Sequence, residues 1–247
     1  MAIEEREGEK SLSKLVSIII TTLNEEHYIE DCLKSLKNQT YKNREIIVVD
    51  SESKDKTVEI ARKYADKILV KNCIIPVGRN IGARMARGNV FLFVDADITL
   101  LPNWIDTVLP YLNEDKVVAV YGDLFPKEGT LKAWLEYGKE ELSNFILRTA
   151  KIPCFGKLGT AVAIRRDAFE KVGGFSEKRA CCEDMDMSFK LRKYGKIKFV
   201  REAKGYVSMR RFERIGYLKL SLLWFFSAIY YILTRNALLP VYSRNYP

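Results

Sequence analysis

Short apolar runs alternate with segments of helical periodicity over the first half of the chain. Four runs have the length and β-branched content of buried strands: 15–20, 45–49, 67–70 and 90–94. Three stretches of helical pattern separate them: 25–39, 56–65 and 77–87. Strands that are apolar throughout and alternate with helices are typical of a parallel sheet covered on both faces. The pattern predicts an α/β fold with a mostly parallel twisted sheet flanked by helices.

Polar residues follow three of these predicted strands at the point where each strand ends. They form the clusters 21–25, 50–55 and 95–97, and each cluster contains a carboxylate. In parallel α/β sheets, ligands bind at the carboxyl ends of the strands. We therefore expect the three clusters to converge on one edge that suits a sugar, a ribose, or a metal ion with a phosphate.

The third cluster, Asp95-Ala96-Asp97, has the most specific chemistry. Two carboxylates one residue apart at the end of a buried strand can hold a hard divalent cation against a diphosphate. The alternative is an Asx turn that only ends the strand. Neither GxGxxG nor GxxxxGK[ST] follows the first strand, which argues against a dinucleotide-binding domain and a P-loop NTPase.

Composition and charge narrow the class of partner. The 247 residues are 47% hydrophobic and 30% charged, which suits one large domain or two small ones. The formal net charge of +9 favours polyanionic or membrane-surface partners. The basic residues form no long block and no nucleic-acid-binding motif occurs, so we expect no nucleic acid partner.

Cysteine and histidine usage argues against disulfides and zinc. The five cysteines contain no CxxC pair, and the single histidine, His27, lies apart from them on the first predicted helix, where we expect a surface or packing residue. Residues 1–14 are charged and carry no apolar core, which predicts a disordered, solvated tail and no secretory signal. Together these features predict a cytoplasmic location.

Several motifs together resemble the family 2 glycosyltransferases of the GT-A fold, and they occur in the family's order. They are VSIIITTLNEE (16–26), QTY (39–41), EIIVVDSESKDKT (45–57), GRNIG (78–82), FVDAD (93–97), IRRDAF (164–169), GGF (173–175), EDMD (183–186) and Gly195. The resemblance covers roughly residues 15–200. It implies a UDP- or GDP-sugar donor, a divalent metal ion such as Mn²⁺ or Mg²⁺, and inversion at the anomeric carbon.

The resemblance also implies roles for single residues. The nucleotide-binding set is Thr21, Thr22, Glu25, Asp50, Ser51, Arg79 and Asp95. Within this set Glu25 would lie near the ribose, Asp50 and Ser51 would face the base, and Arg79 would support the base. Asp97 would be the direct metal ligand, and Asp95 would contact the ribose or the metal.

An acidic helix start at 182–192 is the candidate for the catalytic base. In the family's pattern Asp184 would be the general base, since a carboxylate within hydrogen-bond reach takes the proton of an attacking alcohol. Glu183 would orient the acceptor or Asp184, and Asp186 would cap or brace the helix. The alternative is that these are ordinary acidic residues favoured by the helix dipole.

Ser208-Met209-Arg210-Arg211 is predicted to be a loop whose adjacent arginines, Arg210 and Arg211, clamp the donor diphosphate. The alternative is a solvated basic turn. Because no histidine occurs in this region, we expect the metal to rest on Asp97, the donor phosphates and water, and to bind weakly without nucleotide.

Two apolar segments lie in the second half. Residues 131–149 are predicted to be a helix, followed by a loop at 151–157, and this helix either packs in the core or faces the acceptor. Residues 220–233 are the most apolar stretch; the helix would be about 22 Å long, against a hydrocarbon core of ~30 Å. It would pack on the domain, lie at a membrane surface, or contact another protomer. Basic and aromatic flanks favour peripheral membrane contact through 214–244.

The sequence therefore predicts a tail (1–14), a GT-A glycosyltransferase domain (15–205) and a C-terminal basic loop with an apolar helix (206–247). The predicted activity is metal-dependent, inverting sugar transfer to a hydroxyl on a glycan or lipid-linked saccharide, at the cytoplasmic face of a membrane. The alternatives are a polyprenyl-phosphate glycosyltransferase, a sugar nucleotidyltransferase, and a non-catalytic nucleotide-sugar or membrane-binding protein. The glycine-rich, arginine-containing loop that a nucleotidyltransferase needs after its first strand is absent.

Overall fold

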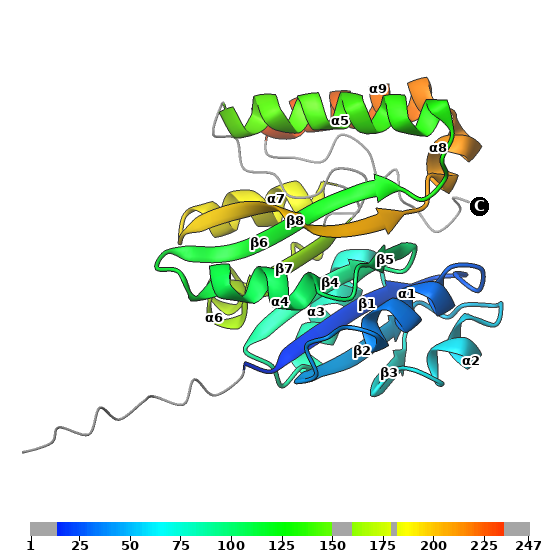
Figure 1. The fold of residues 1–247 in the computed structure, drawn as a ribbon, viewed down its shortest axis with the longest axis vertical. Helices are drawn as coiled ribbons and strands as arrows, with labels where there is room; N and C mark the ends of the chain where they lie inside the picture. The colour runs from blue at the N-terminus through cyan, green and yellow to red at the C-terminus, as the bar shows by residue number, and fades with distance from the viewer. Residues whose placement is uncertain (1–13, 150–159, 179–181, 235–247) are drawn as a thin grey trace, which may run out of the picture.

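The computed structural model describes residues 14–149, 160–178 and 182–234 (Figure 1). The first half of the chain builds the parallel part of the sheet, with strands in the order β3-β2-β1-β4. Its elements are β1 (Val16–Thr22), α1 (Ile29–Lys37), β2 (Arg44–Asp50), α2 (Thr57–Ala61), β3 (Lys67–Val70), α3 (Ile75–Met85) and β4 (Val90–Asp95). The four predicted strands are therefore confirmed, and so is the α/β class.

The second half extends the sheet in the order β4-β7-β6-β8-β5. Only β6 and β8 pair in parallel here; the other pairs are antiparallel. The elements are β5 (Ile98–Leu100), α4 (Trp104–Val108), the 3₁₀-helix η1 (Leu109–Asn113), β6 (Val117–Pro126), α5 (Leu131–Thr149), β7 (Ala161–Arg165), α6 (Arg166–Lys171), α7 (Glu183–Arg192), β8 (Lys196–Val207), α8 (Arg210–Ile215) and α9 (Tyr217–Thr234). Helices cover both faces of the sheet (Figure 1).

The strand register brings the polar clusters together. Thr21 at the end of β1 is opposite Asp95 at the end of β4, and Thr22 is opposite Asp50 at the end of β2. The carboxyl ends of three parallel strands therefore meet at one edge of the sheet, as the sequence pattern predicts.

Side chains alternate between two buried layers along β1. Ile18 and Ile20 pack in the layer that contains the buried residues of α1, whereas Ile19 packs in the layer that contains Ala83 of α3. Helix α3 lies very close to β1, since a Cβ at Gly82 would come within 2.4 Å of Ile19 Cγ2. This close approach fixes the position of the residues on α3, including Arg79.

The bounds of α1, α2, α3 and α9 differ from the sequence prediction, with α2 ending at Ala61 and not at residue 65, and two differences lie next to the candidate site. Helix α1 begins at Ile29 and not at residue 25, because residues 24–26 are tied to the loop before α2: the Glu25 amide donates to Thr57 Oγ1 at 2.7 Å and the Glu26 amide to Asp55 Oδ2 at 3.0 Å. The prediction of a loop at 208–211 is wrong in its second half, since Arg210 and Arg211 begin α8.

Helices α5 and α9 lie side by side at one end of the molecule, away from the parallel strands (Figure 1). The bounds predicted for α5 are confirmed, but the interpretation as core packing is wrong. The large apolar residues of α5 that suggested it are exposed: Leu131, Trp134, Leu135, Leu142, Phe145 and Ile146. The predicted loop at 151–157 lies outside the described residues. The proposed division of the domain at residue 205 stays a prediction.

Candidate active site

The residues after β1 and β2 form a loop region braced by buried polar groups. Asp50 is fully buried; its carboxylate accepts hydrogen bonds from Thr22 Oγ1 at 2.8 Å and from the Ser53 amide at 2.8 Å. Ser51 Oγ donates to the Cys73 carbonyl at 2.6 Å. The side chains of Asp50 and Ser51 therefore shape the edge of the sheet, and their contact with a base stays a prediction.

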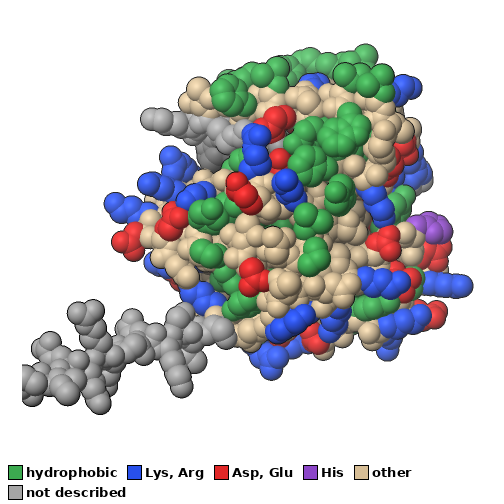
Figure 2. Space-filling view, viewed as in Figure 1, with side chains coloured by type: hydrophobic (Ala, Val, Ile, Leu, Met, Phe, Trp, Pro, Cys, Tyr) green, Lys and Arg blue, Asp and Glu red, His purple; other side chains and the backbone are tan. Residues whose placement is uncertain are grey.

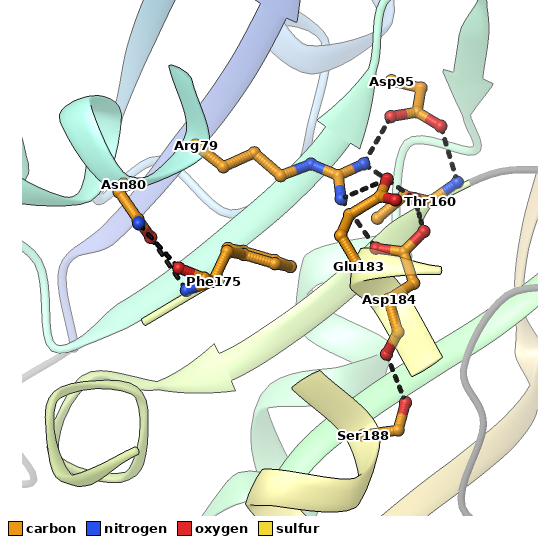
Figure 3. Close-up of polar contacts among 8 residues, drawn as sticks. All are labelled: Arg79, Asn80, Asp95, Thr160, Phe175, Glu183, Asp184 and Ser188. Atoms are coloured by element: carbon orange, nitrogen blue, oxygen red, sulfur yellow. Dashed lines mark hydrogen bonds and ion pairs between the residues drawn. The ribbon is translucent and has the colours of Figure 1, made fainter. Parts of the chain in front are cut away.

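Arg79 lies at the centre of an acidic cluster (Figure 3). Its Nη2 donates to Asp95 Oδ1 at 2.9 Å, and its Nη1 donates to Asp184 Oδ1 at 2.6 Å and to Glu183 Oε1 at 3.4 Å. Its side chain is only 4% exposed. The guanidinium is held by these carboxylates, because α3 directs it towards the start of α7. The role of Arg79 in supporting the nucleotide base stays a prediction.

Thr160 completes this cluster and was not identified from the sequence. Its amide donates to Asp95 Oδ2 at 2.9 Å, and its hydroxyl donates to Asp184 Oδ2 at 3.0 Å while accepting from Arg79 Nη2 at 2.9 Å. Both carboxylates are thus bonded at both oxygens. A single threonine ahead of a strand carries no sequence signal for such a role, since its importance comes only from the pairing of β4 with β7.

Neighbouring groups hold the Arg79 guanidinium in place. The Phe175 ring lies 5.1 Å from Arg79 Cζ. Asn80 fixes the backbone of Phe175 by donating to its carbonyl and accepting from its amide, both at 2.9 Å (Figure 3). Arg79 therefore has an aromatic contact as well as its ion pairs, and it is a rigid part of the site.

Burial and mutual repulsion shift the acidic groups at the start of α7. Burial and the adjacent negative charge of Asp184 raise the pKa of Glu183 to about 8. Burial also raises the pKa of Asp184, against the opposing charge of Arg79. Two hydrogen bonds favour the ionised form of Asp184, and its negative charge in turn favours the protonated form of Glu183.

Arg210 joins a second pair of carboxylates. Its Nη2 donates to Glu25 Oε1 at 2.6 Å and its Nε donates to Asp97 Oδ2 at 3.2 Å. Its guanidinium also lies 4.3 Å from the ring of Tyr28. Arg211 follows it on α8 and lowers the pKa of Asp97 electrostatically, although burial of Asp97 outweighs this and raises that pKa.

Glu25 keeps unused bonding capacity in this second cluster. Its Oε2 is buried and accepts no hydrogen bond from the described residues. Burial raises the pKa of Glu25 to about 7, against the hydrogen bond and charge of Arg210. A buried carboxylate oxygen with no donor is costly unless a ligand or ion meets it.

The two clusters meet at Asp95-Ala96-Asp97. Asp95 bonds to Arg79, which bonds to Asp184, while Asp97 two residues later bonds to Arg210. The acidic end of β4 and the acidic start of α7 therefore belong to one site, although 87 positions separate Asp97 from Asp184 in the chain. Such a site can bind a charged group next to Asp97 and Arg210 and also supply a proton acceptor, Asp184.

The structure also places three other residues that the sequence analysis covered. Thr21 is partly exposed and contacts α3, since a Cβ at Gly78 would come within 2.8 Å of Thr21 Cγ2. His27 is highly exposed, as expected for a surface residue. Tyr231, in the segment 214–244 predicted to contact a membrane, is buried and donates to Asp186 Oδ1 at 3.0 Å.

The described residues contain no group of three or more histidine, cysteine or acidic side chains placed to hold a metal ion. The donor set at the edge is nevertheless suited to a hard cation, because Asp97 and Glu25 supply carboxylate oxygens and Glu25 Oε2 lacks a partner there. A cationic group, the Arg210 guanidinium, already lies between them. The site therefore fits a divalent ion that takes few protein ligands.

Comparisons with known proteins place the chain among glycosyltransferases. The model of Glycosyl transferase family 2 matches residues 17–173. An uncharacterized glycosyltransferase of Rickettsia typhi is 33% identical over 78% of this chain and 64% of its own length. Another from Haemophilus influenzae is 28% identical over 72% of this chain and 62% of its own length. The chain thus spans less than two thirds of these relatives.

Solved structures share the fold. A mannosyltransferase from Pyrobaculum calidifontis, in complex with GDP-Man and Mn²⁺, superimposes with a TM-score of 0.64 at 21% identity, covering 78% of this chain and 56% of that one. Residues 1–349 of S. aureus TarS, in complex with UDP-GlcNAc, give a TM-score of 0.62 at 21% identity, covering 79% and 58%. These similarities confirm the GT-A fold.

Proposed function

Because this chain belongs to glycosyl transferase family 2, we propose that it transfers a sugar from a nucleoside-diphosphate sugar to a hydroxyl acceptor. The observation that carries the proposal is the connection of Asp184 through Arg79 to Asp95 at the end of β4. A proton acceptor and the residues next to the expected leaving group then share one site, which is the arrangement a displacement reaction requires.

The donor is proposed to be a UDP- or GDP-sugar bound at the ends of β1, β2 and β4. Solved relatives of the same fold bind GDP-Man or UDP-GlcNAc, which supports this class of donor. Thr21, Thr22, Glu25 and the loop shaped by Asp50 and Ser51 line the nucleoside side in this proposal. Arg210 and Arg211 then contact the diphosphate, because their cationic groups lie at the Asp97 side of the edge.

Asp184 is proposed to be the general base. Arg79 and Thr160 orient its carboxylate and favour its charged form, and its side chain is 29% exposed, so an acceptor hydroxyl can approach it. The acceptor oxygen loses its proton to Asp184 as it attacks the anomeric carbon. Glu183 is less exposed, and burial beside Asp184 raises its pKa to about 8, which suits a hydrogen-bond donor to the acceptor.

A divalent metal is proposed to bind at Asp97, with Asp95 and the unpartnered oxygen of Glu25 nearby. When bound, Mn²⁺ or Mg²⁺ would neutralise charge on the departing nucleoside diphosphate. The chain's own contribution is to hold cationic groups, Arg210 and Arg211, on the same side. Attack from the Asp184 side and departure from the Asp97 side give a single displacement with inversion.

The acceptor is proposed to be a hydroxyl on a glycan or lipid-linked saccharide. A polyprenyl phosphate oxygen is already anionic and requires no base, so the Glu183–Asp184 pair favours a hydroxyl. A peripheral membrane contact in 214–244, on the cytoplasmic side, belongs to the same proposal. Lys219 and Arg214 in this segment are exposed; residues beyond 234 lie outside the described part of the chain.

A donor screen tests the proposed function directly. UDP- and GDP-sugars are incubated with the full chain and Mn²⁺ or Mg²⁺, and nucleoside diphosphate release is measured with and without sugar acceptors. Proton NMR of the product then gives the anomeric configuration, which inversion makes opposite to that of the donor. Pyrophosphate release from an NTP and a sugar phosphate would instead identify a nucleotidyltransferase. Donor binding without turnover on any acceptor would favour a binding protein.

A further inference from the structure

Large apolar side chains are exposed mainly on two helices. Sixteen such side chains are exposed in the described part of the chain, and twelve of them lie on α5 and α9. These twelve, which we call the α5–α9 apolar surface, are Leu131, Trp134, Leu135, Leu142, Phe145, Ile146, Leu218, Leu222, Phe225, Phe226, Ile229 and Leu233. Soluble monomers rarely expose contiguous apolar patches larger than a few hundred Å².

Each helix presents its exposed apolar residues as a single stripe. On α9 they follow the first at spacings of 4, 7, 8, 11 and 15 residues, and on α5 at spacings of 3, 4, 11, 14 and 15. These spacings return to one face of an α-helix. Gly138 lies seven residues after Leu131, on the same face of α5, and has no side chain. The exposed apolar residues therefore lie on one face of each helix, with Lys139 at the side of the face on α5.

The apolar face of α5 points outwards, whereas that of an ordinary surface helix points towards the core. Among the residues of α5 whose burial is described, the fully buried ones, Ala133, Glu136 and Asn144, are small or polar, and Tyr137 is partly buried against the core. Glu136 accepts a hydrogen bond from Ser221 of α9 at 2.7 Å, and Asn144 donates to the Glu140 carbonyl at 2.8 Å. An amphipathic helix that only packs on its own domain turns its apolar stripe inwards. The outward stripe of α5 is therefore not explained by packing on the described part of the domain.

The two stripes face the same way. Ser221 on α9 bonds to both Glu136 and Lys139 on α5, which joins the helices side by side. Both helices lie at the same end of the molecule in Figure 1, and apolar side chains cover that end in Figure 2. The α5–α9 apolar surface is thus a broad two-helix face.

We propose that the α5–α9 apolar surface seats the protein on an anionic lipid membrane. Exposed cations border it at Lys132, Lys219 and Arg214, and Lys219 is the only charged residue of α9. Within the twelve side chains, Trp134 Nε1 is the only hydrogen-bonding group, whereas a protein partner normally forms about ten hydrogen bonds across an interface. Acyl chains need none, and basic borders attract anionic headgroups.

Helix α9 lies along the membrane in this proposal and does not cross it. By length and composition it is the one described helix that is apolar enough to span a bilayer. It is held lengthwise, however, by Ser221 on α5 and by Tyr231, which donates to Asp186 on α7 at 3.0 Å. Crossing would carry Glu136 and Asp186 into the hydrocarbon, which is expensive.

A further contact of α9 connects the α5–α9 apolar surface to the candidate active site. Cys182, directly before Glu183 and Asp184, lies with its Sγ 3.8 Å from the Ser227 carbonyl of α9. Seating α9 on lipid therefore sets the height of the acceptor side above the membrane. If the proposed glycosyl transfer is correct, this geometry favours an acceptor that is itself lipid-linked.

Vesicle flotation of the full chain tests the proposal. We expect the protein to float with phosphatidylcholine vesicles containing phosphatidylglycerol, and less with phosphatidylcholine alone. The double variants Phe145→Ser/Ile146→Ser on α5 and Phe225→Ser/Phe226→Ser on α9 should each lower the partition coefficient about tenfold or more, because each removes two apolar side chains from lipid. Val70→Ser, at an exposed apolar position on β3, is the matched control and should leave it unchanged. Circular dichroism melting confirms that each variant is folded.

Three outcomes would overturn the proposal. The α5 variant floating as well as the unmodified chain would exclude α5 from the contact. Absence of flotation with any vesicle would exclude the membrane. A dimer in analytical ultracentrifugation that both double variants dissociate, without flotation, would assign the surface to a second copy of the chain. Flotation uses no donor, so calorimetric binding of nucleotide sugars separately decides whether the proposed function holds.

Discussion

Arg79 and Arg210 each join carboxylates from distant parts of the chain, but the protein holds them in different ways. The Arg79 side chain is 4% exposed, projects from an 11-residue helix packed on β1, and contacts three acidic groups. The Arg210 side chain is 26% exposed and projects from the six-residue helix α8. The first arginine is a buried counter-ion, whereas the second is a partly solvated cation.

The difference explains the chemistry assigned to each side of the site. Around Arg79 the carboxylate oxygens of Asp95 and Asp184 are bonded in fixed directions, which suits a base that must be oriented before substrate arrives. Around Arg210 one oxygen of Glu25 has no donor within the described residues. This side of the site is therefore the one to which we assign the proposed donor and metal ion.

Replacing Arg79 should have the largest effect on stability. Arg79→Met leaves Asp95, Glu183 and Asp184 without their buried counter-ion, and removal of one partner from a buried ion pair costs about 3–5 kcal/mol. The midpoint of thermal unfolding should fall by about 10 °C. Arg210→Met is the matched comparison and should cost less than half as much, because that side chain is partly solvated. Equal losses for the two variants would contradict the comparison.

Replacing the proposed base should abolish most turnover without unfolding the protein. Asp184→Asn keeps the side-chain volume but removes the proton acceptor, so kcat should fall about 10³-fold while the dissociation constant of the donor changes little. Steady-state rates and calorimetric donor binding measure the two quantities. Asp167→Asn, an exposed acidic residue in the first turn of α6, is the control. Transfer at an undiminished rate would remove Asp184 as the base.

The sequence could predict the parallel half of the site because its information is local. Apolar runs and the polar clusters that follow them identify β1, β2 and β4, and the rule for parallel sheets then brings Thr21 and Asp95 together. The antiparallel half depends on non-local pairing. Thr160 reaches Asp95 only because β7 inserts beside β4, which no periodicity in the sequence reveals.

Helix α5 illustrates a different limit. The spacing of its apolar residues predicts the helix and its bounds. Spacing alone does not show whether the apolar face is buried in the domain or exposed. Core packing was the simpler interpretation, and it is wrong because the opposite face supplies Glu136 and Asn144, which are buried with polar partners. Similarly, the sequence predicts a loop at Arg210 and Arg211, because a six-residue helix has too few turns to show helical periodicity.

Removing the positive charge of Arg210 should change the affinities for metal ion and nucleotide in opposite directions. Arg210→Gln takes away the positive charge between Glu25 and Asp97, so Mn²⁺ alone should bind about tenfold more tightly, or ~1.4 kcal/mol. UDP or GDP should bind more weakly, because a diphosphate contact is lost. Calorimetry without a sugar acceptor measures both affinities, and Arg214→Gln on the same helix controls for net charge. Weaker Mn²⁺ binding would show that Arg210 does not compete with the metal.

The last expected effect concerns pH and the protonation of Glu183 beside Arg79. The pKa of Glu183 rises from an ordinary value near 4.5 to about 8, so the folded state binds this proton more tightly than the unfolded state. Its contribution to stability is complete below about pH 4.5 and is lost as pH rises through about 8. Glu183→Gln cannot lose a proton. Its unfolding midpoint should match that of the unmodified chain near pH 4 and exceed it near pH 9. Glu170→Gln, an exposed residue of α6, should show no such divergence. Parallel curves for Glu183→Gln and the unmodified chain would mean that Arg79 keeps Glu183 ionised, which would make Glu183 as credible a base as Asp184.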